Sequence, residues 1–168
     1  GTTPGSEAHE RIDTHGRDVA ALLAELAIER AVLVGHSMGC RVALGALEVL
    51  SSGRKSTLRS INQVILAAAD VDAAIMPMLA PHAVDYCTRT TSYACEKDQA
   101  LKISGWLHDF ARVGVAPPTF ILSGMDTVLV NNLELGGFSH GYVGSSRSVL
   151  NDIFNLLKFN RPPQDRHG

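Results

Sequence analysis

The segment Gly35-His36-Ser37-Met38-Gly39 is the part of the sequence whose residue types and spacing point most directly to chemistry. It fits the pattern G-x-S-x-G, follows a short apolar run and precedes a helical pattern. In such a setting the serine lies on a tight, strained turn, and glycines two residues away avoid collisions with the strand and the helix. The N–H of Met38, at a helix N-terminus, then stabilises an oxyanion. The alternative is a glycine-bounded turn with an incidental serine.

A serine hydroxyl is a weak nucleophile and needs a base, usually a histidine oriented by a carboxylate. Where a serine lies on such a turn, the acid and then the histidine follow it along the chain. The chain has seven histidines: His9, His15, His36, His82, His108, His140 and His167. His140 has the favoured position, in the loop 136–141 between the last strand region and the last helix. We expect His36 to point away from the serine hydroxyl, and the alternative for His140 is an exposed loop residue without a role.

The choice of acid is more open. Asp98 follows the third strand region and opens the next helix, which is the usual position for the acid. Asp70 and Asp72 follow the second strand and are alternative acids, although Asp70 also suits a helix N-cap. Asp126 lies between Ser37 and His140 in sequence but begins a strand region. Chain order and placement therefore favour Asp98.

The elements that must position these residues alternate along the chain. Apolar spacing predicts a first helix that is capped at Asp13 or Thr14 and carries Val19, Leu22, Leu23 and Leu26. The apolar run 31–34 predicts a strand buried on both faces. Further helices are expected over 38–50, 70–79, 99–110 and around 149–157, and further strands over 64–68, within 83–94, and over either 119–122 or 126–130. This alternation predicts an α/β fold: a mostly parallel sheet of about four strands with helices on both faces.

Composition excludes several classes of protein. The chain has 168 residues, with 45% hydrophobic and 19% charged residues, which is unlike a disordered protein. The net charge of −2 and the lack of a basic stripe argue against a nucleic-acid partner. The longest apolar runs are shorter than the ~20 residues that span a bilayer. We predict a single domain over 1–160 and a polar, frayed tail over 161–168.

The cysteines and the N-terminal end carry little functional signal. Cys40, Cys87 and Cys95 form neither a disulfide framework nor a zinc pattern, so we expect buried free thiols, with a Cys87–Cys95 bridge as the alternative. No metal or cofactor is expected. Residues 1–6 have the appearance of a processed or truncated start, which leaves the compartment of a soluble protein open between the cytoplasm and secretion after processing.

These residues together resemble the α/β-hydrolase superfamily, and more narrowly a bacterial family of uncharacterised hydrolases. The resemblance runs from Ser37 to Leu157, about three-quarters of the chain. Its marks are His36-Ser37-Met38-Gly39-Cys40-Arg41-Val42, Ala69-Asp70-Val71-Asp72, Lys97-Asp98-Gln99-Ala100-Leu101, Asp126-Thr127-Val128 and Ser139-His140-Gly141-Tyr142. That family has Ser where this chain has Gly141. The resemblance implies a serine carboxylic-ester hydrolase with Ser37, Asp98 and His140 as its triad.

One departure from the full hydrolase fold concerns the sheet. Only one helix and some polar residues precede the strand that carries the elbow, so the strands that normally flank it on one side are absent, together with the loop that supplies the second oxyanion N–H. Three outcomes are open: N-terminal residues replace that donor, a second chain covers the open edge, or the chain is a fragment with little activity. For the edge, we expect a second copy or an irregular N-terminal coil to lie across 32–34.

Two functions follow from these observations. The first is an esterase or lipase that works through an acyl-enzyme, and the low aromatic content of 5% favours small soluble esters over long-chain lipids. The second is a catalytically poor, minimal hydrolase scaffold that serves as an interaction module. The order of serine, acid and histidine favours the first function, because function is argued from the site and not from the fold. Amide hydrolysis and acyl transfer use the same triad and are not separated from ester hydrolysis by the sequence.

Overall fold

The sheet is the frame on which the candidate site is built. The computed structural model describes residues 4–53, 55–131 and 139–166. Its four strands all run parallel in the order β1-β2-β3-β4. Their bounds are β1 (Ala31–His36), β2 (Ile61–Ala67), β3 (Arg89–Cys95) and β4 (Met125–Val130). The predicted parallel four-stranded α/β fold is confirmed, and of the two alternatives for the last strand the structure has the one near 126–130.

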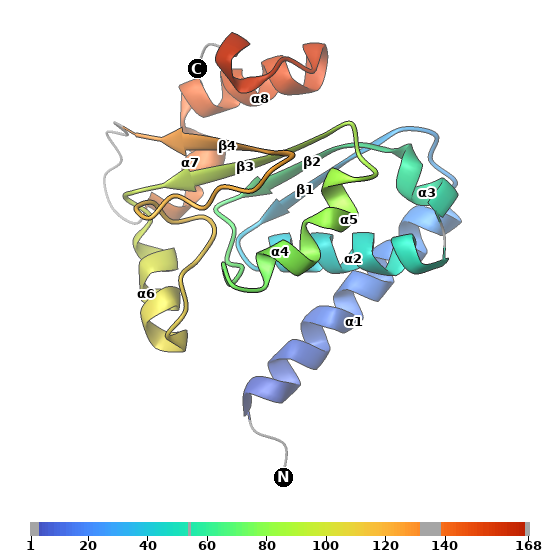
Figure 1. Ribbon diagram of the computed structural model, residues 1–168, viewed down its shortest axis with the longest axis horizontal. Helices are drawn as coiled ribbons and strands as arrows, with labels where there is room; N and C mark the ends of the chain where they lie inside the picture. Colours follow the sequence, from blue (N-terminus) through green and yellow to red (C-terminus); the bar gives the residue numbers. More distant parts are fainter. Residues whose placement is uncertain (1–3, 54, 132–138, 167–168) are drawn as a thin grey trace.

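Helices cover both faces of this sheet (Figure 1). Below it in that view lie α1 (Pro4–Glu25), α2 (Gly39–Gly53), α4 (Met76–Leu79) and α5 (Pro81–Val84). The upper face carries α8 (Arg147–Phe159). The remaining elements are α3 (Lys55–Ser60), α6 (Gln99–His108), α7 (Tyr142–Ser145) and two 3₁₀ turns, η1 (Ser139–Gly141) and η2 (Pro163–Asp165).

Two apolar clusters hold the layers together. Along β2 successive side chains alternate between the faces, so Val64 and Leu66 pack with α2, while Ile65 packs with Tyr93 and Leu156 on the α8 side. A strand whose residues are buried on both faces has a continuous apolar run, as β2 does over 64–67. The core therefore lies on both sides of β2 and β3.

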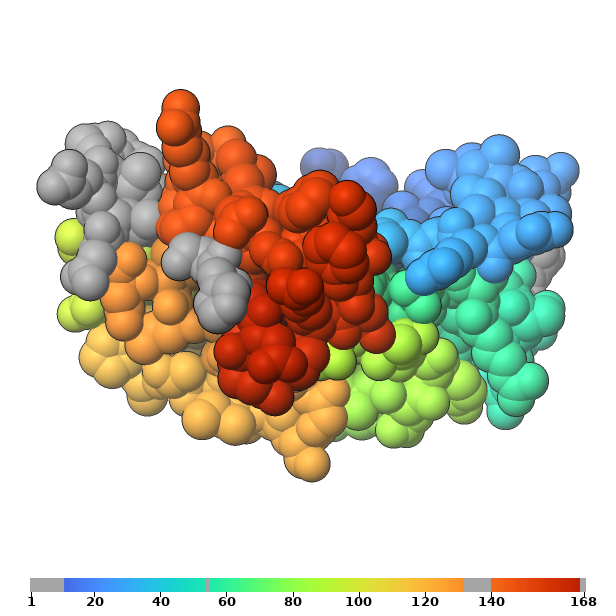
Figure 2. Space-filling model, turned by 90° about the horizontal axis from the view of Figure 1, so that it is seen from above, coloured from blue at the N-terminus to red at the C-terminus, as the bar shows by residue number. Residues whose placement is uncertain are grey.

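The first strand differs from its prediction. Leu33 packs on the α2 side, but Val32 is 42% and Val34 58% exposed on the other face. The expectation that 31–34 is buried on both faces is wrong, because α8 lies over β2 and β3, where Gln63 Nε2 donates to the Leu156 carbonyl at 2.9 Å. Figure 2, seen from the α8 side, shows α8 in red over the middle of that face, apart from the blue segments of α1 and β1.

The N-terminal region also differs. Helix α1 begins at Pro4, a residue that suits the first turn of a helix, and not at Asp13 or Thr14. Asp13 lies inside the helix and accepts a hydrogen bond from Arg41 of α2 at 3.1 Å. Because residues 4–25 form a helix packed on α2, the expected irregular coil across the β1 edge is wrong for them.

Two further expectations are corrected by local interactions. No helix spans 70–79: the Asp72 carboxylate accepts the Ala74 N–H at 2.8 Å, a turn that competes with helix, and α4 begins only at Met76. The prediction of a frayed tail is wrong for residues 161–166, which include η2 and the buried Arg166. Arg166 has a fully buried side chain, 3.4 Å from the Asp152 carboxylate and 3.8 Å from that of Asp126.

Candidate active site

Ser37 lies on the turn between β1 and α2. Its φ of 54° is in the left-handed region, which a non-glycine residue rarely adopts. The turn is fixed by backbone hydrogen bonds: Ser37 N–H donates to Ala67 O at 3.0 Å, and Ser37 O accepts from Cys40 N–H at 3.1 Å and from Asp70 N–H at 3.2 Å. These bonds hold the strained serine against the end of β2.

The two glycines of the motif differ in what surrounds them. A Cβ on Gly35 would lie 2.6 Å from Cys40 Cα, so only glycine fits there. A Cβ on Gly39 would meet no described atom within 4 Å. The expected collision with strand and helix therefore applies to Gly35, while at Gly39 the described residues leave open space.

Met38 follows the serine directly at the start of α2. Its carbonyl accepts from the Arg41 N–H at 3.0 Å and from the Val42 N–H at 3.3 Å, so Met38 lies immediately before the first turn of α2. The N–H groups of a first turn have no partner within the helix and carry the positive end of the helix dipole. The predicted oxyanion donor, the Met38 N–H, therefore belongs to the positive end of α2 next to Ser37.

Asp98 and His140 are brought together at the carboxyl edge of the sheet. His140 Nδ1 lies 2.8 Å from Asp98 Oδ2 and 3.0 Å from Oδ1, and the Asp98 side chain is fully buried. Asp98 also caps α6, because its Oδ1 accepts the Leu101 N–H at 3.0 Å. The carboxylate is thus fixed by the helix that it begins and accepts from one nitrogen of the imidazole.

The alternative acids interact elsewhere. Asp70 accepts from Ser104 Oγ at 2.9 Å and lies 3.1 Å from Arg112 Nε. Asp72 caps the turn described above, and Asp126 pairs with Arg89 at 2.7 Å. The recorded side-chain contacts of these three carboxylates do not include His140.

His36 contacts the segment that carries His140. Its ring centroid lies 4.8 Å from that of His140, with the planes tilted by 52°, and its Nε2 lies 3.1 Å from the His140 carbonyl oxygen. No sequence pattern pointed directly to this contact, because 104 residues separate the two histidines. The only available hint was topological, since the carboxyl ends of parallel strands meet at one edge of a sheet.

The other histidines have separate roles or lie outside the described side chains. His108 Nδ1 lies 2.9 Å from Ser104 O on its own helix, and His82 Nδ1 lies 2.9 Å from Ser51 Oγ. His15 is 3.9 Å from Asp18 on α1. The side chain of His9 and all of His167 lie outside the described residues, as does the part of the expected loop over 136–138.

Tyr142 anchors the segment that carries His140. Its side chain is fully buried, and its hydroxyl donates to the Tyr93 carbonyl at 2.9 Å. Burial raises the pKa of the Tyr142 phenol well above its ordinary value, so the hydroxyl stays protonated and remains a donor. This residue stands in the Ser-His-Gly-Tyr segment but was not singled out from the sequence.

The cysteines are free and buried, which confirms the expectation of buried thiols. Burial raises the pKa of Cys40 to about 12 and that of Cys87 to about 11. Burial likewise raises the pKa of Cys95. A thiol is nucleophilic as its thiolate, so these residues are inert near neutral pH.

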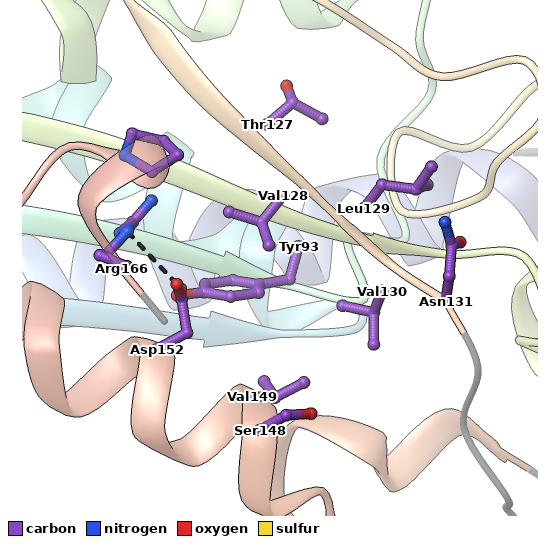
Figure 3. A pocket seen from close by; sticks show the side chains of 11 residues that line it. Tyr93, Thr127, Val128, Leu129, Val130, Asn131, Ser148, Val149, Asp152 and Arg166 are labelled. Atoms are coloured by element: carbon purple, nitrogen blue, oxygen red, sulfur yellow. Dashed lines mark hydrogen bonds and ion pairs between the residues drawn. The ribbon is translucent and has the colours of Figure 1, made fainter. Parts of the chain in front are cut away.

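A separate pocket of about 330 Å³ lies between β4 and α8 (Figure 3). Tyr93 donates to Asp152 on its wall, and Arg166 lies beside the same carboxylate. Neither Ser37 nor Asp98 nor His140 lines this pocket. It is therefore distinct from the serine turn and the Asp98–His140 pair.

Comparisons with known proteins give one match. A family model described as "Alpha/beta hydrolase of unknown function (DUF900)" matches residues 12–153. No curated protein and no solved structure matches the chain. Within the described residues, no helix combines the length and apolar character needed to cross a membrane, and no group of three or more potential metal ligands occurs.

Proposed function

The chain belongs to the DUF900 family of α/β hydrolases of unknown function, and from that premise we propose that it is a serine hydrolase that cleaves carboxylic esters through an acyl-enzyme. Ser37 is the proposed nucleophile, His140 the base and Asp98 the acid that orients it. The observation that carries the proposal is the bond between the buried Asp98 carboxylate and His140 Nδ1, at 2.8 Å, in a chain whose Ser37 lies on a strained turn.

The proposed mechanism follows from the proton positions. A neutral His140 that donates its Nδ1 proton to Asp98 has its lone pair on Nε2. Nε2 removes the proton from Ser37 Oγ as the oxygen attacks the ester carbonyl, and the Met38 N–H stabilises the oxyanion. The imidazolium then protonates the leaving alcohol. A water molecule, activated in turn by His140, releases the acid and regenerates Ser37.

The substrate class rests on composition. Aromatic residues make up 5% of the chain, which favours small esters that are soluble in water over long-chain lipids. Apart from the ester and water, the proposed reaction uses no cofactor, metal or nucleic acid.

One observation favours a second candidate function. The edge of β1 is unpaired in the described sheet, and Val32 and Val34 beside it are exposed. A minimal hydrolase scaffold that uses this edge as an interaction module, with little catalysis, is the alternative to an esterase.

The decisive experiment is a rapid-mixing assay with a short-chain p-nitrophenyl ester. With an activated ester, whose acyl-enzyme forms faster than it is hydrolysed, we expect a burst of p-nitrophenol equal to the concentration of active sites, followed by a slower steady state. Ser37→Ala is the matched control, because it removes only Oγ, and it should show neither phase. A wild-type protein that gives no burst and no steady turnover, and is not labelled by a phosphonate at Ser37, would favour the scaffold.

A further inference from the structure

His36 and His140 form a pair that ties the nucleophile strand to the turn of the proposed base. His36 is the last residue of β1 and directly precedes Ser37, whereas His140 lies in the middle of η1. His36 Nε2 is 3.1 Å from the His140 carbonyl oxygen, and the two rings lie 4.8 Å apart. The residue next to the proposed nucleophile therefore contacts the backbone of the proposed base.

The chemistry of the contact fixes the proton positions on both rings. A backbone carbonyl only accepts, so the proton of the His36–His140 bond must lie on His36 Nε2. The Asp98 carboxylate accepts from His140 Nδ1. His140 is consequently held at two points: its side chain by Asp98 and its main chain by His36.

The hydrogen bond from His36 to the main chain of His140 matters because of where His140 lies. The 3₁₀ turn η1 spans three residues, and such short turns have few hydrogen bonds of their own and poor bond geometry. Its main described neighbours are α6, which Asp98 caps, and α7, which begins with Tyr142. The contact between His36 Nε2 and the His140 carbonyl links η1 to β1, the strand that leads into Ser37.

We propose that His36 is a positioning residue of the proposed hydrolase, which sets the distance between His140 and Ser37 by donating from Nε2 to the His140 carbonyl. The inference rests on the proposed function for its kinetic consequence, but the hydrogen bond itself is testable without turnover. His36 is exposed, so substitutions there do not open the core. A misplacement of a catalytic group by about 1 Å lowers the rate by about 100-fold.

Three substitutions of His36 separate the effect of its hydrogen-bond donor from the effect of its ring. His36→Gln keeps an N–H near the position of the imidazole Nε2. His36→Asn carries the same amide one methylene shorter, and His36→Phe keeps a ring without a donor. We expect His36→Gln to retain kcat within about threefold, and the Asn and Phe variants to lose about 10-fold to 100-fold in kcat with little change in KM. His108→Phe is the control, since His108 also contacts a carbonyl but lies on α6.

A spectroscopic arm reports on the bond without substrate. The nitrogen and proton resonances of the His140 imidazole are assigned by their loss in His140→Ala. They should be unchanged in His36→Gln and shifted or broadened in the Asn and Phe variants. The melting temperatures of all three His36 variants should equal that of the wild-type protein. Full activity and unchanged His140 resonances in His36→Phe overturn the inference, as does equal loss in all three variants. If the wild-type protein hydrolyses no ester, the proposed function fails. The resonances alone then test whether His36 holds the His140 carbonyl through a hydrogen bond.

Discussion

The carboxylate of Asp98 begins helix α6 and accepts the Nδ1 proton of His140, 42 residues further along the chain. One oxygen of this carboxylate, Oδ1, accepts from the Leu101 N–H and also lies 3.0 Å from His140 Nδ1. Helix geometry and imidazole orientation are thus set by one buried side chain.

Replacement of this carboxylate should be far more damaging than replacement of the neighbouring acids. Asp98→Asn is expected to lower kcat by about 1,000-fold or more, because an amide stabilises neither the required tautomer nor the imidazolium. Asp70→Asn and Asp72→Asn should retain most of the activity, since these side chains contact Arg112 and the Ala74 N–H. Steady-state assays of all three variants test the assignment, and an inactive Asp70→Asn or Asp72→Asn would move the acid to the end of β2.

Removal of the nucleophile or the base should abolish ester turnover in a folded protein. We expect Ser37→Ala and His140→Ala each to lower kcat by about 1,000-fold or more, because triad members act as a unit. His108→Ala should leave turnover nearly unchanged. A soluble Ser37→Ala protein that keeps more than about a tenth of the wild-type activity would contradict the nucleophile assignment.

The two glycines of the serine turn should differ in their tolerance of a methyl group. Gly35→Ala is expected to lower the free energy of unfolding by about 1–3 kcal/mol, because its Cβ would overlap the backbone at Cys40 and Gly39. Gly39→Ala should be neutral or slightly stabilising, since no described atom lies within 4 Å of the new carbon. Urea unfolding midpoints measure both effects. Equal destabilisation by the two variants would contradict the predicted difference between the glycines.

The buried thiols predict a loss of stability in alkaline solution. Burial raises the pKa of Cys40 from 9.0 to about 12, so above pH 9 the unfolded chain releases a proton that the folded chain retains. The stabilisation is complete below pH 9 and is lost progressively as the pH rises toward 12. Unfolding midpoints should fall between about pH 9 and about pH 12, less steeply in Cys40→Ala. Cys40 that reacts rapidly with a thiol reagent at neutral pH, without denaturant, would contradict this.

The open edge of β1 predicts self-association. We propose that two copies pair through this edge, because in the described sheet the outer edge of β1 has no partner strand and the exposed Val32 and Val34 lie on the same strand. Light scattering at micromolar concentration should report a mass above that of the monomer. Val34→Lys, which places a charge on the exposed face of the edge strand, should return the protein to the monomer. A monomeric wild-type protein under these conditions would rule out the pairing.

Local sequence patterns predicted most elements of the fold. The order of serine, acid and histidine along the chain identified Ser37, Asp98 and His140 as candidates. What they missed depends on tertiary contacts. An apolar run does not tell how far α8 extends over the sheet, so the exposure of Val34 was not predicted. The turn at Asp72 replaces a helix through one side-chain bond. The contact between His36 and His140 joins segments that only the parallel sheet brings together.

The place of β1 in the sheet has a further consequence for the serine turn. Among the described residues, β2 and β3 have hydrogen-bonded strands on both sides, whereas β1 is bonded to β2 alone. Strands held on one side open locally at lower free energy, so their amide protons exchange with solvent faster. In the isolated chain, the strand that leads into Ser37 should therefore exchange before the strands next to Asp98. Partial unfolding confined to β1 would then disassemble the serine turn while β2, β3 and α8 remain folded.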